Sequence, residues 1–494
     1  MKTLLDPAVG IAPRLPHDAG APALNGPAVF AMTPGHFAHY TLPVRGAAPM
    51  TFSVEGQLPG GIVFDPAKGR FGGVAAAEGD FPLRVTVRNA EGEASREFTL
   101  SVRRGKLCAA PLMGWTSWNA WKRSLDQQKI LSAAKLMKSL GLAARGYDHV
   151  NLDSCWQGNR DHEQGGLLPN SRFPDLPGLV REIHDLGLRA GIYSTPMVLA
   201  WGSNRRELFP GSTGYPLDPA AFHDYFGGCG LTSFEDEDAA LWAEWGFDYL
   251  KYDWSMCDIL HTRRMREALD KTGRDIILSL TTRCDVKLIE EYRKYAQMCR
   301  CNGDTLDLWP VLENNIRSAD PWLGVTGPGT WFDLDMLALG VMEIGRDRPS
   351  LPVGKNNLTR DEAITHFSVW SILGSPLQLS CQLEKIDDFT LDLVSNEEII
   401  ALNQDITGTA ELVRSETLAA EGTPRREFRV YRKALADGSR AFCFVNLAEH
   451  PDRVTFSPDG ERRVRDLWAR RDLGRTSRLE MVLPAHGCRV LKLS

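Results

Sequence analysis

A long alternation of apolar strand-like runs and amphipathic helix-like runs constrains the fold of this chain more than any other feature. Strand candidates such as YDHVNLD, LRAGIYS, FDYLKYD and DIILSL alternate with helix candidates such as LVREIHDLG and MREALDKTG between residues 111 and 405. This alternation predicts βα units and a parallel sheet. A segment of about 295 residues suits a (β/α)8 TIM barrel, which we favour over an open doubly wound sheet.

The chain on either side of this segment has a different pattern. Residues 26–105 and 406–494 consist of short alternating runs, such as DFPLRVTVRN and RAFCFVNLA, separated by Gly, Asn and Pro. The pattern predicts an N-terminal immunoglobulin-like β-sandwich and a C-terminal antiparallel β-sandwich. Residues 1–25 are rich in Ala, Pro and Gly, and we expect an extended lead-in there. The predicted fold is therefore multidomain, with a barrel over residues 106–405 flanked by two β domains.

Composition excludes several classes of function. The 494-residue chain has 57 Lys and Arg against 63 Asp and Glu, with both signs interspersed, so neither a nucleic acid nor a membrane is an expected partner. No Gly-x-Gly-x-x-Gly follows a strand candidate, and no P-loop is present, which argues against nucleotide binding. The ten Cys form no Cys-x-x-Cys pair and the eleven His show no paired ligand spacing, so we expect neither a metal nor a cofactor.

Charged residues follow the predicted strands at four places. In a (β/α)8 barrel the carboxyl ends of the strands share one cavity, where catalytic residues gather. A single acid at such a place often caps the next helix, but four strand ends together indicate a site. Two carboxylates are what glycoside hydrolysis needs, because one attacks the anomeric carbon while the other protonates the leaving oxygen. The candidate residues are Asp153, Lys251, Asp253, Arg300, Asp304, Asp333 and Asp335.

Seven segments in this region resemble, in order, the motifs of glycoside hydrolase family 27, the α-galactosidase and melibiase group. The resemblance implies a (β/α)8 barrel, a C-terminal antiparallel β domain and a metal-free double displacement that retains the anomeric configuration. It runs from about residue 111 to residue 405. The segments are MGWTSWNAW, NLDSCW, GLRAGIYS, WGFDYLKYD, GPGTWFDLDML, HFSVWSILGSPLQLS and SNEEIIALNQD.

Matched motif by motif, the resemblance places the nucleophile at Asp253 and the acid/base at Asp304, which ends an Arg-x-x-x-Asp motif. We expect Asp253 to stay ionised beside Lys251, and Asp304 to hold a proton through burial or repulsion from Asp253. The substrate-binding residues that the resemblance implies are Trp118, Asp153, Tyr193, Lys251, Arg300 and Asp335. We add Ser154 and Thr282, which stand where the sequence departs from the family.

Four departures from the family pattern bear on the sugar: a substitution after Asp153, substitutions in two further motifs taken together, a smaller residue beside the 2-hydroxyl pocket, and an insertion. Ser154 replaces a second acid that in family members holds the axial 4-hydroxyl of galactose. Thr195 replaces the acid that ends the family's Gly-Ile-Tyr-Ser-Asp, and Phe332 replaces a polar residue. Thr281 or Thr282 stands where α-galactosidases place a Glu beside the 2-hydroxyl pocket, and a smaller side chain could admit an N-acetyl group.

The fourth departure is an insertion at about residues 196–230, where relatives have a short loop. A long loop without clear secondary structure is often functional, and we expect this one to overhang the active site. A surface elaboration is the alternative, since loops tolerate insertions at little cost. A family disulfide also lacks its second cysteine here, because Arg123 occupies the partner position, so we predict Cys155 to be a buried thiol.

Our leading hypothesis is a retaining exo-glycoside hydrolase that removes a terminal α-galactosyl or closely related residue from an oligosaccharide or glycoconjugate. The alternatives within the family are α-N-acetylgalactosaminidase, β-L-arabinopyranosidase and isomalto-dextranase, and a carbohydrate-binding protein without catalysis is the alternative outside it. By family habit we expect a bacterial, periplasmic or secreted enzyme whose signal segment is absent from this chain. A cytoplasmic location and a homo-oligomer both stay open.

Overall fold

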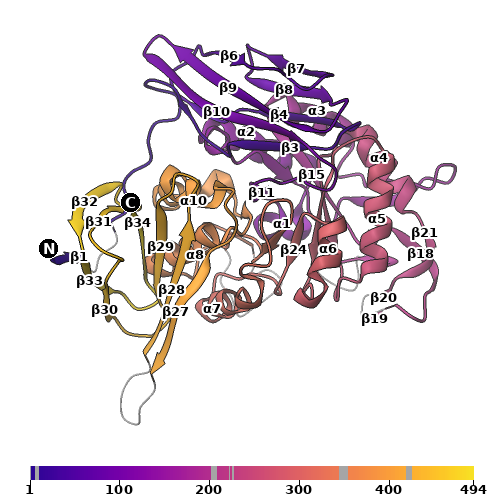
Figure 1. The fold of residues 1–494 in the computed structure, drawn as a ribbon. Coiled ribbons are helices and arrows are strands. Elements are labelled where there is room, and N and C mark those ends of the chain that lie inside the picture. Colours follow the sequence, from indigo (N-terminus) through magenta and orange to yellow (C-terminus); the bar gives the residue numbers. More distant parts are fainter. Residues whose placement is uncertain are drawn as a thin grey trace.

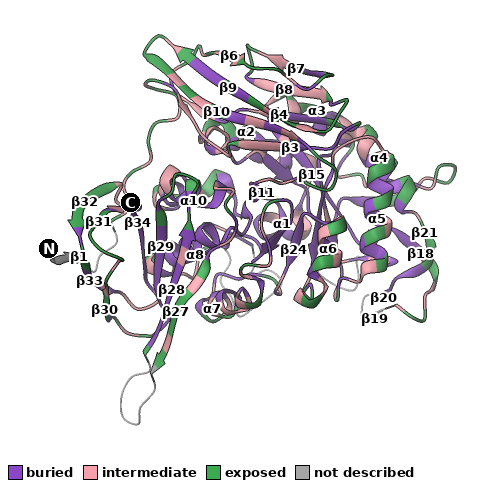
Figure 2. Ribbon diagram, viewed as in Figure 1, coloured by how far each residue is buried: buried purple, intermediate pink, exposed green. Residues whose placement is uncertain are grey.

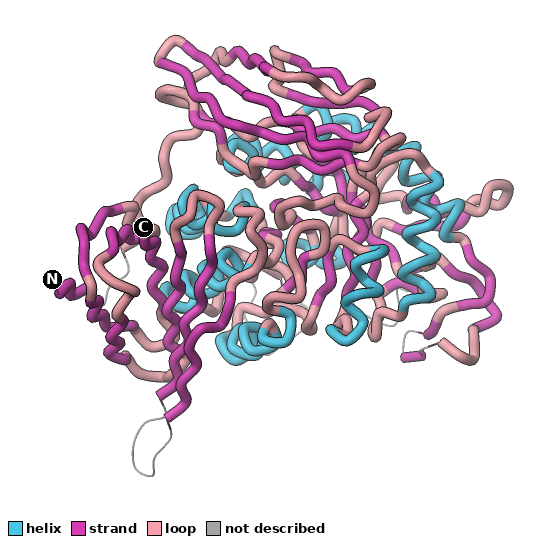
Figure 3. The backbone as a smooth tube through the Cα atoms, viewed as in Figure 1, coloured by secondary structure: helices cyan, strands magenta, loops and turns pink. Residues whose placement is uncertain are grey.

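Three parts make up the protein in the computed structural model: an N-terminal β module, a central barrel and a C-terminal β domain (Figure 1). The structure describes residues 2–5, 10–201, 209–221, 223–224, 227–343, 354–418 and 426–494. The module lies over one end of the barrel, and the C-terminal β domain packs against its side, as Figures 1 and 3 show.

Eight parallel strands form the barrel, and each is hydrogen-bonded to its neighbours in chain order. The last strand returns to the first, and a bridge between Leu337 and Leu379 closes the remaining edge. The predicted barrel is confirmed. Its strands are β11 (Met113–Thr116), β12 (His149–Asn151), β15 (Arg189–Ser194), β22 (Tyr249–Asp253), β23 (Ile277–Thr281), β24 (Met298–Arg300), β25 (Trp331–Asp333) and β26 (Leu377–Leu379).

Helices cover the outside of the barrel. Several begin at a side chain that caps free backbone N–H groups, as Asp126, Asp175, Asp258 and Thr359 do. Helix α8 is buried almost all round because it lies between the barrel and the C-terminal domain (Figure 2). The helices are α1 (Trp118–Trp121), α2 (Gln127–Ser139), α3 (Leu176–Asp185), α4 (Glu235–Trp245), α5 (Ile259–Lys271), α6 (Ile289–Tyr295), α7 (Trp309–Ser318), α8 (Arg360–Leu373), α9 (Asp388–Val394) and α10 (Glu397–Gln404).

The N-terminal module is a sandwich of two sheets. Alternate side chains of its strands, such as Leu83 and Val85, pack with Phe71 and Phe98 in a core of its own. One sheet contains β3 (Val29–Met32), β10 (Gly92–Val102), β9 (Gly79–Asn89) and β6 (Thr51–Glu55), and the other β4 (Phe37–Thr41), β8 (Arg70–Val74) and β7 (Ile62–Asp65). Two short strands, β2 (Ala23–Leu24) and β5 (Val44–Arg45), pair beside them.

The module binds the barrel at the amino ends of the strands. The N–H of Phe37 donates to the carbonyl of Gly273 at 2.7 Å, and the N–H of Asp275 donates back to the carbonyl of Phe37 at 3.0 Å. The N–H of Thr33 donates to the Asp275 carboxylate at 2.8 Å. These contacts lie just before β23, so the module covers the end of the barrel opposite the carboxyl ends of the strands.

The C-terminal domain has a six-stranded antiparallel sheet and a three-stranded sheet. Strand β1, in the predicted lead-in, pairs with β33 in parallel, with Lys2 opposite Arg478, which the sequence analysis did not anticipate. The larger sheet contains β27 (Glu411–Leu418), β28 (Arg426–Ala434), β29 (Arg440–Asn446), β34 (Cys488–Leu493), β31 (Arg462–Asp466) and β32 (Arg471–Thr476). The smaller contains β1 (Lys2–Leu5), β33 (Arg478–Leu483) and β30 (Asp452–Phe456).

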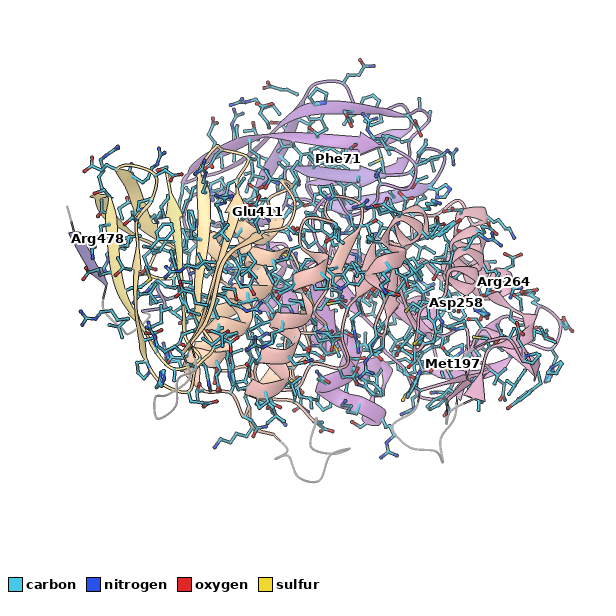
Figure 4. The ribbon with its side chains drawn as sticks, turned by 60° about the horizontal axis from the view of Figure 1, so that its bottom comes forward. Phe71, Met197, Asp258, Arg264, Glu411 and Arg478 are labelled. Atoms are coloured by element: carbon cyan, nitrogen blue, oxygen red, sulfur yellow. The ribbon has the colours of Figure 1, made fainter. Side chains whose placement is uncertain are left out.

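The insertion contains strands, so the expectation of a loop without secondary structure is wrong. Its described residues form short antiparallel pairs, and residues 202–208, 222 and 225–226 lie outside the described part of the chain. Figure 4 shows Met197 of the insertion and Phe71 of the module on opposite sides of the barrel. The strands are β16 (Leu199–Ala200), β17 (Phe209–Pro210), β18 (Thr213–Leu217), β19 (His223–Asp224), β20 (Gly227–Gly228) and β21 (Gly230–Ser233). A separate pair, β13 (Gln157–Arg160) and β14 (Leu167–Pro169), follows β12.

Among the described residues, no helix has both the length and the apolar content needed to cross a membrane.

Candidate active site

The register of the barrel strands brings the predicted site residues together at one end. Tyr193 of β15 lies opposite Lys251 of β22, and Asp253, the last residue of β22, lies opposite Thr281 of β23. Arg300 ends β24, the next strand round the barrel. Because parallel strands end at the same edge, these side chains gather at one end of the barrel.

Asp253 is partly buried and is held by two hydroxyl groups. Thr281 Oγ1 donates to Asp253 Oδ1 at 2.5 Å, and Thr282 Oγ1 donates to the same oxygen at 3.3 Å. Burial raises the pKa of Asp253 above its usual value, and the charges of Lys251 and Arg300 offset this only in part. The predicted pocket residue Thr282 therefore contacts the carboxylate that we predicted to be the nucleophile.

Asp304 lies nearer the solvent, with 47% of its side chain exposed. Arg300 Nη2 donates to Asp304 Oδ1 at 2.6 Å from a guanidinium that is itself buried. Burial works to raise the pKa of Asp304, but the charges of Arg300 and Lys122 outweigh it and hold this pKa well below its usual value. The expected order of protonation is therefore wrong for the protein without substrate, because the ion pair with Arg300 favours an ionised Asp304.

Arg300 also holds Asp335, so one guanidinium joins two carboxylates. Arg300 Nη1 donates to Asp335 Oδ1 at 2.9 Å, and the N–H of Thr305 donates to Asp335 Oδ2 at 2.6 Å. The N–H of Asp335 in turn donates to Asp333 Oδ1 at 2.7 Å. Burial and the charge of Asp335 raise the pKa of Asp333 to about 7. Arg300, Asp335 and Asp333 are thus joined in one hydrogen-bond network.

A further ion pair of the site joins Asp153 and Lys251. Lys251 Nζ donates to Asp153 Oδ2 at 2.8 Å. The next residue, Ser154, is buried, and its hydroxyl donates to the carbonyl of Trp201 at 2.5 Å. The insertion therefore reaches Ser154, and the backbone carbonyl of Trp201 accepts a hydrogen bond from the Ser154 hydroxyl.

Trp118 and Tyr193 supply the aromatic surface of the site. Lys122 Nζ lies 4.4 Å from the centre of the Trp118 ring, and Lys251 Nζ lies 5.5 Å from that of Tyr193. Burial and the nearby charges of Asp253 and Asp153 raise the pKa of Tyr193 well above its usual value. The Tyr193 hydroxyl lies near the Asp253 carboxylate but forms no hydrogen bond of ordinary geometry within the described residues, so it can donate to a ligand.

Sequence reasoning missed two positively charged side chains near Asp304, those of Lys122 and Arg283. Lys122 directly follows the MGWTSWNAW segment, and Arg283 follows the two threonines that contact Asp253. Each was detectable as a charge beside a strand-end motif. What the sequence lacks is any sign that both would lie close to Asp304.

No disulfide joins any of the ten cysteines, all of which lie in described residues. Cys155 is buried, as predicted. The thiols therefore do not constrain the loops around the site by covalent bonds.

Within the described chain, side chains with metal-ligand chemistry come together in one place, at the opposite end of the barrel. Possible ligand atoms of His39, His184 and Asp248 lie within 4.8 Å of one another. Arg274 Nη2 donates to Asp248 Oδ1 at 2.6 Å, so a cation there would meet a guanidinium. We interpret this group as a hydrogen-bonded contact between the module and the barrel.

Three known families each match one of the three parts of the chain. Residues 110–405 match the family described as alpha galactosidase A, and residues 425–493 match the alpha galactosidase C-terminal β-sandwich domain. The chain belongs to the α-galactosidase family, glycoside hydrolase family 27. Residues 21–103 of this glycoside hydrolase match an immunoglobulin-like domain family.

Relatives of this α-galactosidase family member are found among plant enzymes. Arabidopsis thaliana α-galactosidase 3 is 30% identical over 406 residues, which cover 78% of this chain and 82% of the relative. Coffea arabica α-galactosidase is 34% identical over 305 residues, which cover 60% and 71%. The similarity therefore covers the barrel and reaches most of each relative.

Solved structures share the fold. A Bacteroides fragilis protein, named as a candidate α-galactosidase/melibiase, superposes with a TM-score of 0.82 at 26% identity and covers 97% of this chain and 99% of its own. α-Galactosidase I from Mortierella vinacea superposes with a TM-score of 0.62 at 28% identity and covers 79% and 98%. The larger coverage of the first indicates that it has a counterpart of the N-terminal module.

Proposed function

We propose that this family member is a retaining exo-glycoside hydrolase in which Asp253 is the nucleophile and Asp304 the acid/base. The observation that carries the proposal is the contrast between these carboxylates. Asp253 accepts both threonine hydroxyls on one oxygen, whereas Asp304 is half exposed at the same end of the barrel. A nucleophile must face the anomeric carbon, and an acid must reach the leaving oxygen.

The reaction takes two displacements. In the first, an oxygen of Asp253 bonds to the anomeric carbon while the glycosidic bond breaks and Asp304 gives its proton to the leaving oxygen. In the second, the Asp304 carboxylate takes a proton from water, the water oxygen bonds to the anomeric carbon, and Asp253 leaves. Each displacement inverts the anomeric centre, so the product keeps the configuration of the substrate.

Substrate binding must reverse the order of protonation of the two carboxylates. Asp304 holds a proton poorly while Arg300 pairs with it and water reaches it. An aglycone over its exposed half removes that water and raises its pKa, and the two carboxylates then titrate as a pair. Arg300 keeps Asp335 as a second partner, so the guanidinium stays neutralised when Asp304 is protonated.

We propose a terminal α-galactosyl residue as the sugar, because the plant relatives are α-galactosidases and because the Asp153–Lys251 pair and Tyr193 offer charged and neutral partners for hydroxyl groups. Two observations favour alternatives. Ser154 brings no second carboxylate, which leaves β-L-arabinopyranosidase and isomalto-dextranase open. The small Thr282 in place of Glu favours α-N-acetylgalactosaminidase.

A panel of 4-nitrophenyl glycosides tests the sugar. We expect the α-galactoside to have the highest kcat/KM, and turnover of only the α-N-acetylgalactosaminide or the β-L-arabinopyranoside would replace that assignment. The variant Asp253→Gly with azide tests the mechanism, because a retaining enzyme must convert an α-linked substrate into a β-glycosyl azide. An α-configured azide, detected by NMR, would contradict the role of Asp253. Binding without turnover of any glycoside would favour a carbohydrate-binding protein.

A further inference from the structure

We infer that the leaving-group side of this active site binds a negative charge, so that the aglycone of the natural substrate carries a carboxylate or a sulfate ester. The inference rests on the proposed role of Asp304. It adds a class of substrate, an anionic aglycone, to the terminal sugar proposed above.

Asp304 fixes where the aglycone lies. An acid that protonates the leaving oxygen must be within hydrogen-bond reach of it, so the aglycone begins beside the exposed half of Asp304. Lys251, whose charge also acts on Asp304, is paired with Asp153 in the proposed binding site of the terminal sugar. Charges close to Asp304 therefore act on the aglycone.

Arg283 is the first of these charges. It follows Thr282 in the loop after β23, and its backbone has a positive φ of 58°. A Cβ at position 303 would lie 3.4 Å from Arg283 Nη2, so the guanidinium lies against the residue before Asp304. The side chain is exposed, and within the part of the chain that the structure describes no carboxylate pairs with it.

Lys122 is the second charge, and it comes from a different loop. It follows α1, with its ammonium group over the Trp118 ring, and its charge acts on Asp304. Trp118 is one of the predicted substrate-binding residues, so the ammonium group lies beside the expected sugar-binding surface. Two cations from separate loops thus approach Asp304.

A carboxylate or sulfate suits this arrangement better than a neutral group. A guanidinium offers parallel N–H donors to two oxygens of one anion, and charge-assisted hydrogen bonds of this kind are stronger than neutral ones. Lys251 and Arg300 already pair with carboxylates, whereas no carboxylate of the described residues pairs with Arg283, so this guanidinium carries most of the attraction.

Three aryl glycosides of the sugar accepted by the enzyme test the inference: the 4-carboxyphenyl, 4-sulfophenyl and 4-carbamoylphenyl glycosides. The measured quantity is kcat/KM for each anionic substrate divided by that for the carboxamide. In Arg283→Gln we expect this ratio to fall about five- to tenfold relative to the wild type, since intrinsic leaving-group reactivity cancels. Lys122→Gln should also lower this ratio. Salt at about 0.5 M should bring the wild-type ratio closer to one, because it screens the charges of Arg283 and Lys122.

Lys287→Gln is the matched control, because Lys287 is an exposed cation of the same loop region. It should leave the ratio at its wild-type value. Equal ratios in the wild type and Arg283→Gln would overturn the inference while leaving the hydrolase proposal intact. Absence of turnover with all three substrates would overturn the proposed function and the inference with it. A fall confined to the carboxylate or to the sulfonate would identify which anion the site prefers.

Discussion

Two aspartates at opposite ends of strand β22 are held in different ways. Asp248, directly before the strand, accepts hydrogen bonds from His39, His184, Arg274 and the N–H of Ala190, at 3.2, 2.9, 2.6 and 2.9 Å. Asp253, the last residue of the strand, accepts two threonine hydroxyls on one oxygen. Burial works to raise the pKa of both, but the Arg274 guanidinium and the hydrogen bonds from His39 and His184 hold the pKa of Asp248 well below its usual value, whereas that of Asp253 is raised.

The two aspartates lie five positions apart and have different roles: Asp248 stabilises the fold, whereas Asp253 is placed for chemistry. Asp248 has donors on both oxygens, Arg274 balances its charge, and its contact with His39 joins the module to the barrel. A carboxylate with donors on one oxygen keeps nucleophilic capacity on the other. Substitutions at the two ends of β22 should therefore have effects of different kinds.

The largest expected effect is on turnover. Asp253→Asn should lower kcat at least about a thousandfold, because the amide is a poor nucleophile. Thermal unfolding should show no loss of stability, because Asn removes a charge that burial disfavours. Wild-type turnover by Asp253→Asn, or a large fall in its melting temperature, would contradict the proposed role of Asp253.

Asp248→Asn should affect stability instead. Its amide places a donor against other donors and leaves Arg274 without its counter-charge, which costs about 3–5 kcal/mol of unfolding free energy. Chemical denaturation measures this, and kcat of the folded enzyme should stay within about twofold of the wild type. Since the folded pKa of Asp248 is depressed, the stabilisation that it gives should be present above about pH 4 and lost as the pH falls below that value.

Asp270→Asn is the control for this loss of stability. Asp270 pairs with Arg266 at the surface, with 55% of its side chain exposed. Its substitution should change the unfolding free energy by less than about 1 kcal/mol. Equal losses in the two variants would show that Asp248 has no special role.

Thr281→Val should have an intermediate effect on the Asp253 end. The variant keeps the shape but removes the 2.5 Å hydrogen bond, and kcat should fall about ten- to a hundredfold. The pKa of Asp253 should rise further, and because activity needs the ionised form, the acidic limb of the kcat/KM profile should move to higher pH. Thr281→Ser keeps the hydroxyl and should retain the wild-type limb; an unshifted limb in the valine variant would argue against a positioning role.

The smallest expected effect concerns Lys122 and the alkaline limb. Lys122 lowers the pKa of Asp304, so Lys122→Gln should raise that pKa. Activity needs a protonated Asp304 and is lost as the pH rises through its pKa, so the alkaline limb should move to higher pH. Lys287→Gln should leave this limb in place, and a shift to lower pH in Lys122→Gln would reverse the assigned sign.

The barrel and the main site residues could be predicted because both depend on local patterns. Alternating strands and helices imply parallel neighbours, and parallel neighbours bring Lys251, Asp253 and Arg300 to one edge. The protonation order could not be predicted, because it depends on the 2.6 Å pair between Arg300 and Asp304 and on how much water reaches it. The contact between Ser154 and Trp201 was equally out of reach, since a residue 47 positions away, in the insertion, supplies the acceptor.

The pairing of β1 with β33 was also beyond sequence patterns, and it has a consequence for biosynthesis. Residues 2–5 leave the ribosome long before residues 478–483, their partners in the smaller C-terminal sheet. Domains fold largely in the order of translation, so that sheet keeps an open edge until the early segment returns to it. An open edge invites pairing with other chains. Strand β1 thus completes the smaller sheet late, and a segment made early is among the last to reach its final place.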